Sequence, residues 1–101
     1  MNFEEFQTSL GASSPPAHLS GYLQSLWYDS KGDWNRSHEI IQNIEDVPAG
    51  RQDKTAAWIH AYLHRKEGDI GNADYWYRRA GKNRPTIALQ DEWKNIVSAL
   101  L

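Results

Sequence analysis

The chain of 101 residues contains no cysteine, which excludes a disulfide framework and any metal site built on thiolates. It has no apolar run of the roughly 18 residues that a membrane span requires, and its mean hydropathy is −0.75. Seven glycines and four prolines are too few for a collagen-like or low-complexity chain. With a length typical of one domain, the sequence predicts a single folded domain over residues 1–101.

The first six residues include Glu4 and Glu5 but no basic side chain, which is unlike a secretory signal or a transit peptide. We therefore expect a cytoplasmic protein without a membrane partner. Residues 1–50 hold two basic and seven acidic side chains, whereas residues 51–84 hold eight basic and four acidic ones. This asymmetry, with the apolar end at 100–101, points to an anionic partner or to head-to-tail self-association as a homo-oligomer.

Apolar residues recur at helical spacing along nearly the whole chain, and no alternating strand pattern is present. The pattern predicts an all-α fold of about six helices. Their expected ranges are 2–10, 16–31, 34–44, 53–67, 71–80 and 86–101. The expected N-caps are residues with short polar side chains that precede the stripes: Asn2, Asp33, Asp53 or Gln52, and Thr86. The residues 45–50, with Val47-Pro48, are expected to form a loop.

Two Gly-Asp pairs, Gly32-Asp33 and Gly68-Asp69, lie 36 residues apart, and each separates two predicted helices. Glycine tolerates the positive φ at which a helix ends, and aspartate caps the next helix, so each pair predicts a tight helix–turn–helix unit. The two units are expected over residues 17–48 and 53–85. Because a stack of two units buries too little, we expect helix 2–10 to cover the first unit and helix 86–101 the second.

The second unit has small or aromatic residues at regular positions, and a closing proline. They are Ala61, Gly68, Ala73, Tyr77, Ala80 and Pro85. This pattern resembles a tetratricopeptide repeat. The first unit keeps Ser25, Tyr28, Gly32 and Trp34, but has Ser37 and Ile44 where alanine is usual. The whole chain is also similar to small bacterial helical-repeat proteins of unassigned role. The resemblance implies a short right-handed array of antiparallel hairpins that acts as a non-catalytic module binding a protein or peptide.

In that family the first helix of each unit lines a groove that receives an extended peptide or a partner helix. The corresponding residues in this sequence are Tyr22, Leu26, Asp29, Trp58, Tyr62 and Arg65. Aromatic and arginine side chains carry much of the energy of such interfaces. Arg65, Lys66 and Arg51 are expected to steer acidic residues of the partner. The alternative is that the aromatic members are core, because so small a stack needs most of its aromatic side chains inside.

A second interpretation is an RNA- or anion-binding module. Four cations follow one another at the end of predicted helix 71–80: Arg78, Arg79, Lys82 and Arg84. Interleaved with Tyr75, Trp76 and Tyr77, they form a pattern typical of nucleic-acid binders. The helix dipole also favours cations there without a partner, and the sequence pI is only about 6.0. Tyr77 is expected to face the other helix of its hairpin, and Trp76 to pack under the last helix.

His60 and His64 lie four residues apart on one predicted helix with Glu67 on the same side, a spacing at which two imidazoles can share a metal. Because no third ligand is evident nearby in the sequence, we expect a structural role and predict no metal or other cofactor. The carboxylate pairs Glu45-Asp46 and Asp91-Glu92 are expected to be solvated. No serine lies in a nucleophile elbow and no Gly-rich phosphate loop is present, so no enzyme activity is expected.

Overall fold

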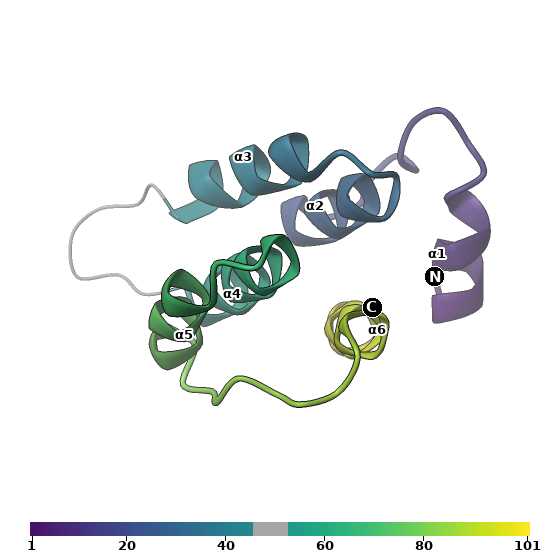
Figure 1. Cartoon of the computed structure of the whole chain (residues 1–101). Coiled ribbons are helices and arrows are strands. Elements are labelled where there is room, and N and C mark those ends of the chain that lie inside the picture. Colours follow the sequence, from purple (N-terminus) through teal and green to yellow (C-terminus); the bar gives the residue numbers. More distant parts are fainter. Residues whose placement is uncertain (46–52) are drawn as a thin grey trace.

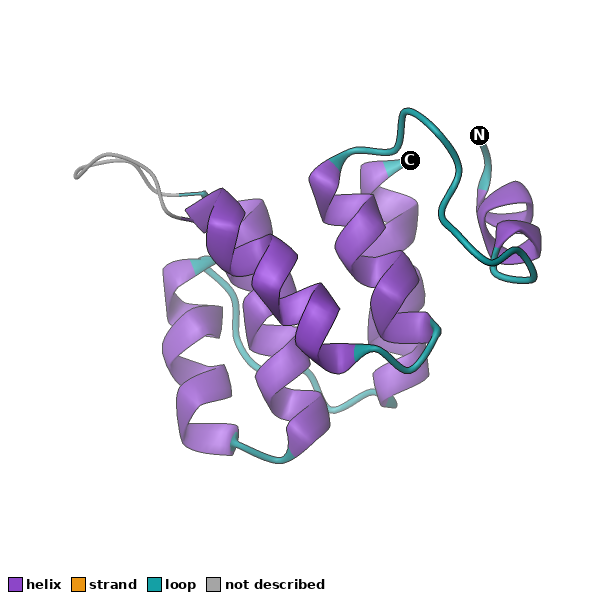
Figure 2. Ribbon diagram, turned by 90° about the horizontal axis from the view of Figure 1, so that it is seen from above, coloured by secondary structure: helices purple, strands orange, loops and turns teal. Residues whose placement is uncertain are grey.

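The computed structural model describes residues 1–45 and 53–101, and every regular element in those ranges is a helix (Figures 1 and 2). The helices are α1 (Phe3–Ser9), α2 (Gly21–Ser30), α3 (Trp34–Glu45), α4 (Lys54–Glu67), α5 (Ile70–Arg79) and α6 (Leu89–Leu100). The predicted all-α fold class is confirmed for the described part. The expected loop with Val47-Pro48, and Arg51 and Gln52, lie outside it. None of the described helices is long and apolar enough to cross a bilayer.

Three of the predicted N-caps are present: Asn2, Asp33 and Asp53. Asn2 forms a capping box, in which its side chain accepts from the Glu5 backbone N–H at 2.8 Å while the Glu5 carboxylate accepts from the Asn2 N–H at 3.1 Å. Asp53 caps α4 by accepting from the Ala56 N–H at 2.9 Å. Local side-chain chemistry therefore sets where α1 and α4 begin.

Two helices begin later than predicted. α2 begins at Gly21 instead of near residue 16, because Ser20 is its N-cap and accepts from the Leu23 N–H at 3.3 Å. Two residues earlier, His18 has a positive φ of 70°, which is incompatible with a continuous helix. α6 begins at Leu89, and the residue before it, Ala88, makes no side-chain cap, so the predicted Thr86 cap is wrong.

The two Gly-Asp turns have the same backbone geometry. Gly32 and Gly68 have φ of 86° and 90°, and each following aspartate N–H donates to the carbonyl oxygen five residues earlier, at 2.9 Å in both turns. The carboxylates of Asp33 and Asp69 then accept from the backbone N–H three residues later, at 3.0 and 3.3 Å. The turns join α2 to α3 and α4 to α5 as two antiparallel hairpins, which meet through α3 and α4.

α6 packs against both α2 and α4, with α1 on its other side (Figure 1). The Trp93 side chain of α6 lies edge-on to Phe3 at 5.9 Å between ring centroids, and its Nε1 donates to the Leu26 carbonyl at 3.1 Å. α6 was expected on the second unit, but it lies across the first helices of both hairpins. The centre of the core contains the fully buried Phe6, Leu26, Ile41, Ile59, Leu63 and Ile96.

Candidate functional site

Asp29 and Tyr62, both predicted to bind a partner, are buried between α2 and α4. Each is 2% exposed, and the Tyr62 hydroxyl donates to the Asp29 carboxylate at 2.9 Å. The Lys66 ammonium donates to the other carboxylate oxygen of Asp29, also at 2.9 Å. Burial and the adjacent Asp29 carboxylate raise the pKa of Tyr62 far above its ordinary value. The pairing offsets the cost of burying the charge, and it joins the two hairpins.

Glu92 on α6 is the centre of a second buried network. It is 2% exposed and accepts from Trp58 Nε1 at 3.3 Å, from the Arg65 guanidinium at 2.9 Å and from the Tyr77 hydroxyl at 2.7 Å. Burial, followed by the hydrogen bond to Glu92, raises the pKa of Tyr77 above its ordinary range. The prediction of a solvated Asp91-Glu92 pair is therefore wrong for Glu92.

The burial of Glu92 could have been predicted from its position in the apolar stripe of α6. The adjacent Asp91 made the two residues look like a solvated acidic pair. Glu92 lies three residues after Leu89 and four before Ile96, within the apolar stripe of α6. A carboxylate on that face must be buried when the stripe packs, and a buried carboxylate requires donors. Arg65 and the tyrosine hydroxyl of Tyr77 supply them.

The five predicted partner-binding residues thus separate into three groups. The Tyr22 hydroxyl donates to Asp53, and this hydrogen bond raises the pKa of Tyr22. Asp29 and Tyr62 bond to each other, whereas Trp58 and Arg65 both bond to Glu92. All of these contacts are made within the chain: the first two groups join α2 to α4 or its N-cap, and the third joins α4 to α6. Partner binding by these residues stays a prediction.

A hollow of about 320 Å³ opens beside Trp58, between α4 and the segment that joins α5 to α6. Pro85 and Ile87 supply apolar walls, and Ile87 is 39% exposed. The Lys82 ammonium lies 4.1 Å from the centroid of the Trp58 ring. Trp58 is only partly buried, so one part of the predicted binding surface remains accessible.

The structure brings together three of the four predicted anion-binding cations. Arg78, Lys82 and Arg84 line a second hollow of about 330 Å³, which shares Tyr77, Lys82 and Asn83 with the first. Arg84 is paired there with Asp74 at 2.9 Å. Arg79 lies elsewhere, since its guanidinium is 5.0 Å from the Trp76 ring centroid.

The two adjacent aromatic residues of α5, Trp76 and Tyr77, contact different parts of the protein. Tyr77 is 1% exposed and packs with Ala61 and Ala73, so it faces α4 as predicted. Trp76 does not pack under the last helix; its ring stacks on the imidazole of His60 at 4.0 Å between centroids, with the planes 14° apart. The prediction for Trp76 is therefore wrong. Helical spacing gave the correct face for Tyr77 but not the neighbour of Trp76.

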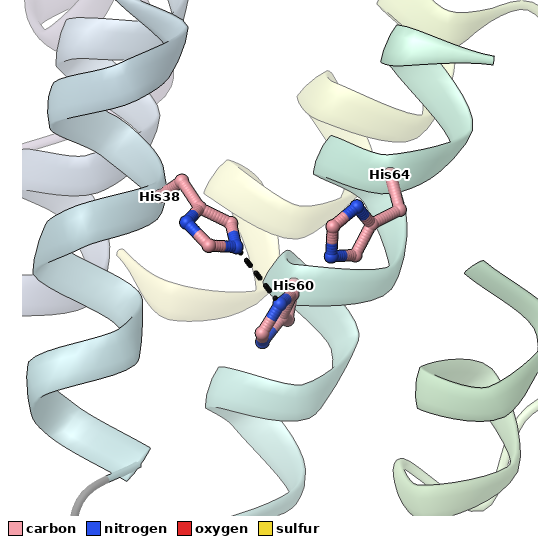
Figure 3. A group of neighbouring side chains, drawn as sticks. All are labelled: His38, His60 and His64. Carbon is pink, nitrogen blue, oxygen red and sulfur yellow. Dashed lines mark hydrogen bonds between the residues drawn. The ribbon is translucent and has the colours of Figure 1, made fainter. Parts of the chain in front are cut away.

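Three histidines, called the histidine cluster from here on, meet where the hairpins touch (Figure 3). His60 and His64 come from α4, and His38 comes from α3. One nitrogen from each ring lies within 4.8 Å of the others, and His38 Nε2 and His60 Nε2 are 3.1 Å apart. The His60 and His64 rings are stacked with centroids 4.7 Å apart, and the ring of His38 from the other helix meets both at a steep angle (Figure 3).

Carboxylates hold the outer nitrogens of the two α4 histidines. His60 Nδ1 lies 2.8 Å from one oxygen of Glu45 and 2.9 Å from the other. His64 Nδ1 lies 2.5 Å from Glu67. The side chain of Glu45 is only 14% exposed, so the prediction that this carboxylate is solvated is also wrong.

His38 is the member of the cluster that the sequence did not indicate. It lies on another helix, 22 residues before His60, so its approach depends on how the hairpins pack. Its ring stacks on Trp34 at 4.9 Å between centroids. Burial lowers the pKa of His38, and the neighbouring imidazoles of His60 and His64 lower it further, which favours the neutral ring.

Comparison of the chain with protein-family models, with curated proteins and with solved structures finds no match in any of the three.

Proposed function

We propose that the chain is a non-catalytic protein-interaction module built from two tetratricopeptide-like hairpins in a short right-handed array. The equal hydrogen-bond pattern of the two Gly-Asp turns supports a duplicated unit. Small buried residues also recur at equivalent positions, with Ser25 and Ser37 in the first hairpin and Ala61 and Ala73 in the second. Such residues let paired helices approach closely, as stacked hairpins require.

The hollow beside Trp58 is the observation that carries the proposal. α6 packs against both α2 and α4, and this hollow is an accessible part of the predicted groove. Another hollow of about 310 Å³ opens beside Asp29 and Tyr62, but both of these side chains are almost fully buried. Trp58, Pro85 and Ile87 offer apolar contact area. Aromatic side chains bury a large area at a modest entropic cost, which is why they often anchor interfaces.

The chemistry of the hollow fits a short peptide that has an apolar side chain next to a carboxylate. The apolar group would lie against Trp58 and Ile87, while its carboxylate would meet the Lys82 ammonium. Asn83 and Asn95 line the same hollow and supply amide groups for the peptide backbone. The sequence predicts that Arg65 steers the partner. Its guanidinium is paired with Glu92, so Arg65 makes no contact with the peptide in this proposal.

A peptide selection tests this proposal on the full chain. A phage-displayed library of random peptides would be selected against the protein, and the enriched peptides would be synthesised and titrated. We expect peptides that pair an acidic residue with an apolar one, and binding at least tenfold weaker in Ile87→Asp and in Lys82→Glu. Ile70→Asp is the matched control, because Ile70 is 38% exposed at the beginning of α5, outside the hollow.

Enrichment of no peptide, or equal weakening by Ile87→Asp and Ile70→Asp, would contradict the proposal. Circular dichroism of each variant separates loss of binding from loss of fold. Neither isoleucine is buried, so both variants are expected to keep the helical spectrum of the parent chain.

RNA or another polyanion is the second candidate, favoured by the hollow that Arg78, Lys82 and Arg84 share. Titration with a single-stranded RNA of mixed sequence at several salt concentrations tests it. Binding through these cations would weaken steeply with salt and be lost in Arg78→Glu. Binding that ignores salt would eliminate this candidate and leave the peptide hypothesis unaffected.

A further inference from the structure

We infer that the histidine cluster is a binding site for a divalent transition metal, with His38, His60 and His64 as ligands and zinc as the ion that fits best. This goes beyond the proposed interaction function and does not depend on it. The inference is carried by the convergence of three imidazoles from two helices and by the two carboxylates behind them.

The hydrogen bonds place lone pairs on the inner nitrogens of the two α4 histidines. An ionised carboxylate only accepts, so Glu45 and Glu67 require a proton on Nδ1 of His60 and of His64. In the neutral rings, Nε2 is then the unprotonated nitrogen. Agreeing with this, the Asn72 side-chain amide lies 3.3 Å from His64 Nε2, where it can donate to that lone pair.

Metal binding requires a change of tautomer at His38 and release of the Asn72 amide from His64 Nε2. Without metal, His38 Nε2 donates its proton to His60 Nε2, at 3.1 Å. On binding, His38 would exchange its Nε2 proton for one on Nδ1, so all three Nε2 atoms would present lone pairs and no net proton would be released. The metal replaces the His38–His60 and Asn72–His64 hydrogen bonds with three coordinate bonds.

The distances suit a tetrahedral ion after a small adjustment. Zinc–nitrogen bonds of about 2.1 Å imply nitrogens about 3.4 Å apart. The His38–His60 pair is already near this value, and the third nitrogen lies within 4.8 Å. A movement of the His64 ring by up to about 1.4 Å completes three ligands, and a water molecule would take the fourth position.

The rings are held in place by their surroundings. Trp76 stacks on His60 and Trp34 stacks on His38. Carboxylates behind ligating histidines fix ring orientation and make the nitrogens better donors, and such outer partners commonly contribute 10–100-fold in affinity. A hollow of about 470 Å³ is lined by Glu45, His60 and Trp76, so the surface of the protein comes close to one member of the cluster.

The ligand set also selects the class of metal. Imidazole nitrogens suit zinc, copper, nickel and cobalt, whereas magnesium and calcium require oxygen ligands. Because His38 belongs to one hairpin and His60 and His64 to the other, the ion would link the two hairpins. Binding should therefore raise the thermal midpoint of unfolding.

The test uses the full chain without a polyhistidine tag, treated with a chelator and then dialysed. Calorimetric titration with zinc chloride is expected to give one ion per chain, and a thermal midpoint higher by about 5 °C or more at saturating zinc. Cobalt chloride should give the visible absorption of a tetrahedral complex, whereas magnesium chloride should change nothing.

Single substitutions identify the ligands. His38→Gln and His64→Gln should each weaken zinc binding at least tenfold, and Glu45→Ala should weaken it 10–100-fold as a positioning residue. His18→Asn is the matched control. It removes the fourth histidine of the chain, which is exposed, and asparagine tolerates the positive φ at that position.

An NMR measurement on the unsubstituted chain identifies the ligands even if some variants fail to fold. Long-range ¹H–¹⁵N spectra should show the imidazole nitrogens of three histidines shifting on zinc addition while the fourth does not move. Absence of stoichiometric zinc binding, equal loss in His18→Asn and His38→Gln, or shifts confined to a different set of histidines would overturn the inference.

Discussion

Ser25 of α2 and Ser37 of α3 face each other inside the first hairpin with their hydroxyl oxygens 2.8 Å apart. Both are fully buried, and Ser25 Oγ also lies 2.9 Å from the Ser37 carbonyl, to which it donates. The equivalent positions 36 residues later hold Ala61 and Ala73, which are also fully buried. Both hairpins therefore bury two small residues at equivalent positions, and in the first hairpin these residues also form hydrogen bonds.

The two serines should differ in their contribution to stability. Ser37→Ala leaves Ser25 with its backbone acceptor and should cost less than about 1 kcal/mol, whereas Ser25→Ala removes the acceptor of the buried Ser37 hydroxyl and should cost about 1–2 kcal/mol. The double variant should cost less than the sum of the two. Urea unfolding of all three variants measures this, and simple additivity would contradict a shared hydrogen bond.

Breaking the Glu92 network should be strongly destabilising. Glu92→Ala leaves Arg65, whose side chain is 14% exposed, without its carboxylate, and should cost about 3–5 kcal/mol. The neighbouring exposed carboxylate gives a matched control, since Asp91→Ala should cost less than about 1 kcal/mol. Chemical denaturation compares the two. Similar losses for both variants would mean that the network does not contribute as described.

The glycines test whether the turns depend on positive φ. Gly68→Ala should cost about 1–2 kcal/mol from the left-handed backbone alone, because the added Cβ would meet no atom within 4 Å. Gly32→Ala should cost a similar amount for the same reason. Gly71→Ala places the methyl group in equally open space but within α5, so it should be neutral or stabilising. Thermal unfolding ranks the three, and a destabilising Gly71→Ala would contradict this reasoning.

α1 should depend on one side chain. Phe6 is its only buried residue and lies 6.0 Å from the Trp93 ring, so Phe6→Ala should cost about 3–5 kcal/mol. A helix of seven residues cannot persist without such packing. Gln7→Ala, at the exposed neighbour, should change stability by less than about 0.5 kcal/mol. Hydrogen exchange locates the loss; if only the α1 amides lose protection in Phe6→Ala, α1 unfolds separately from the rest.

Much of the local structure was predictable because its causes lie within a few residues. The Asn2 and Asp53 caps and both Gly-Asp turns follow from side chains that bond backbone groups three residues away and from glycines at positive φ. The starts of α2 and α6 were not predictable in this way. His18 adopts a positive φ although it is not glycine, and Ala88 precedes α6 without a capping side chain.

The candidate sites depended on contacts between distant helices. The resemblance to tetratricopeptide repeats placed Asp29, Trp58, Tyr62 and Arg65 on one groove, but it did not indicate that α6 would pack there. Helical spacing paired His60 with His64, whereas His38 reaches them only because α3 packs against α4.

The sequence by itself determined the helices and the two Gly-Asp turns, because capping, helical periodicity and the conformational freedom of glycine act over one or two turns of chain. Only the tertiary structure decided that Glu92 is buried among Arg65, Trp58 and Tyr77, and that three imidazoles converge. Those outcomes depend on the rotation of each helix about its axis and on which helix covers which, and both are set by packing the whole core at once.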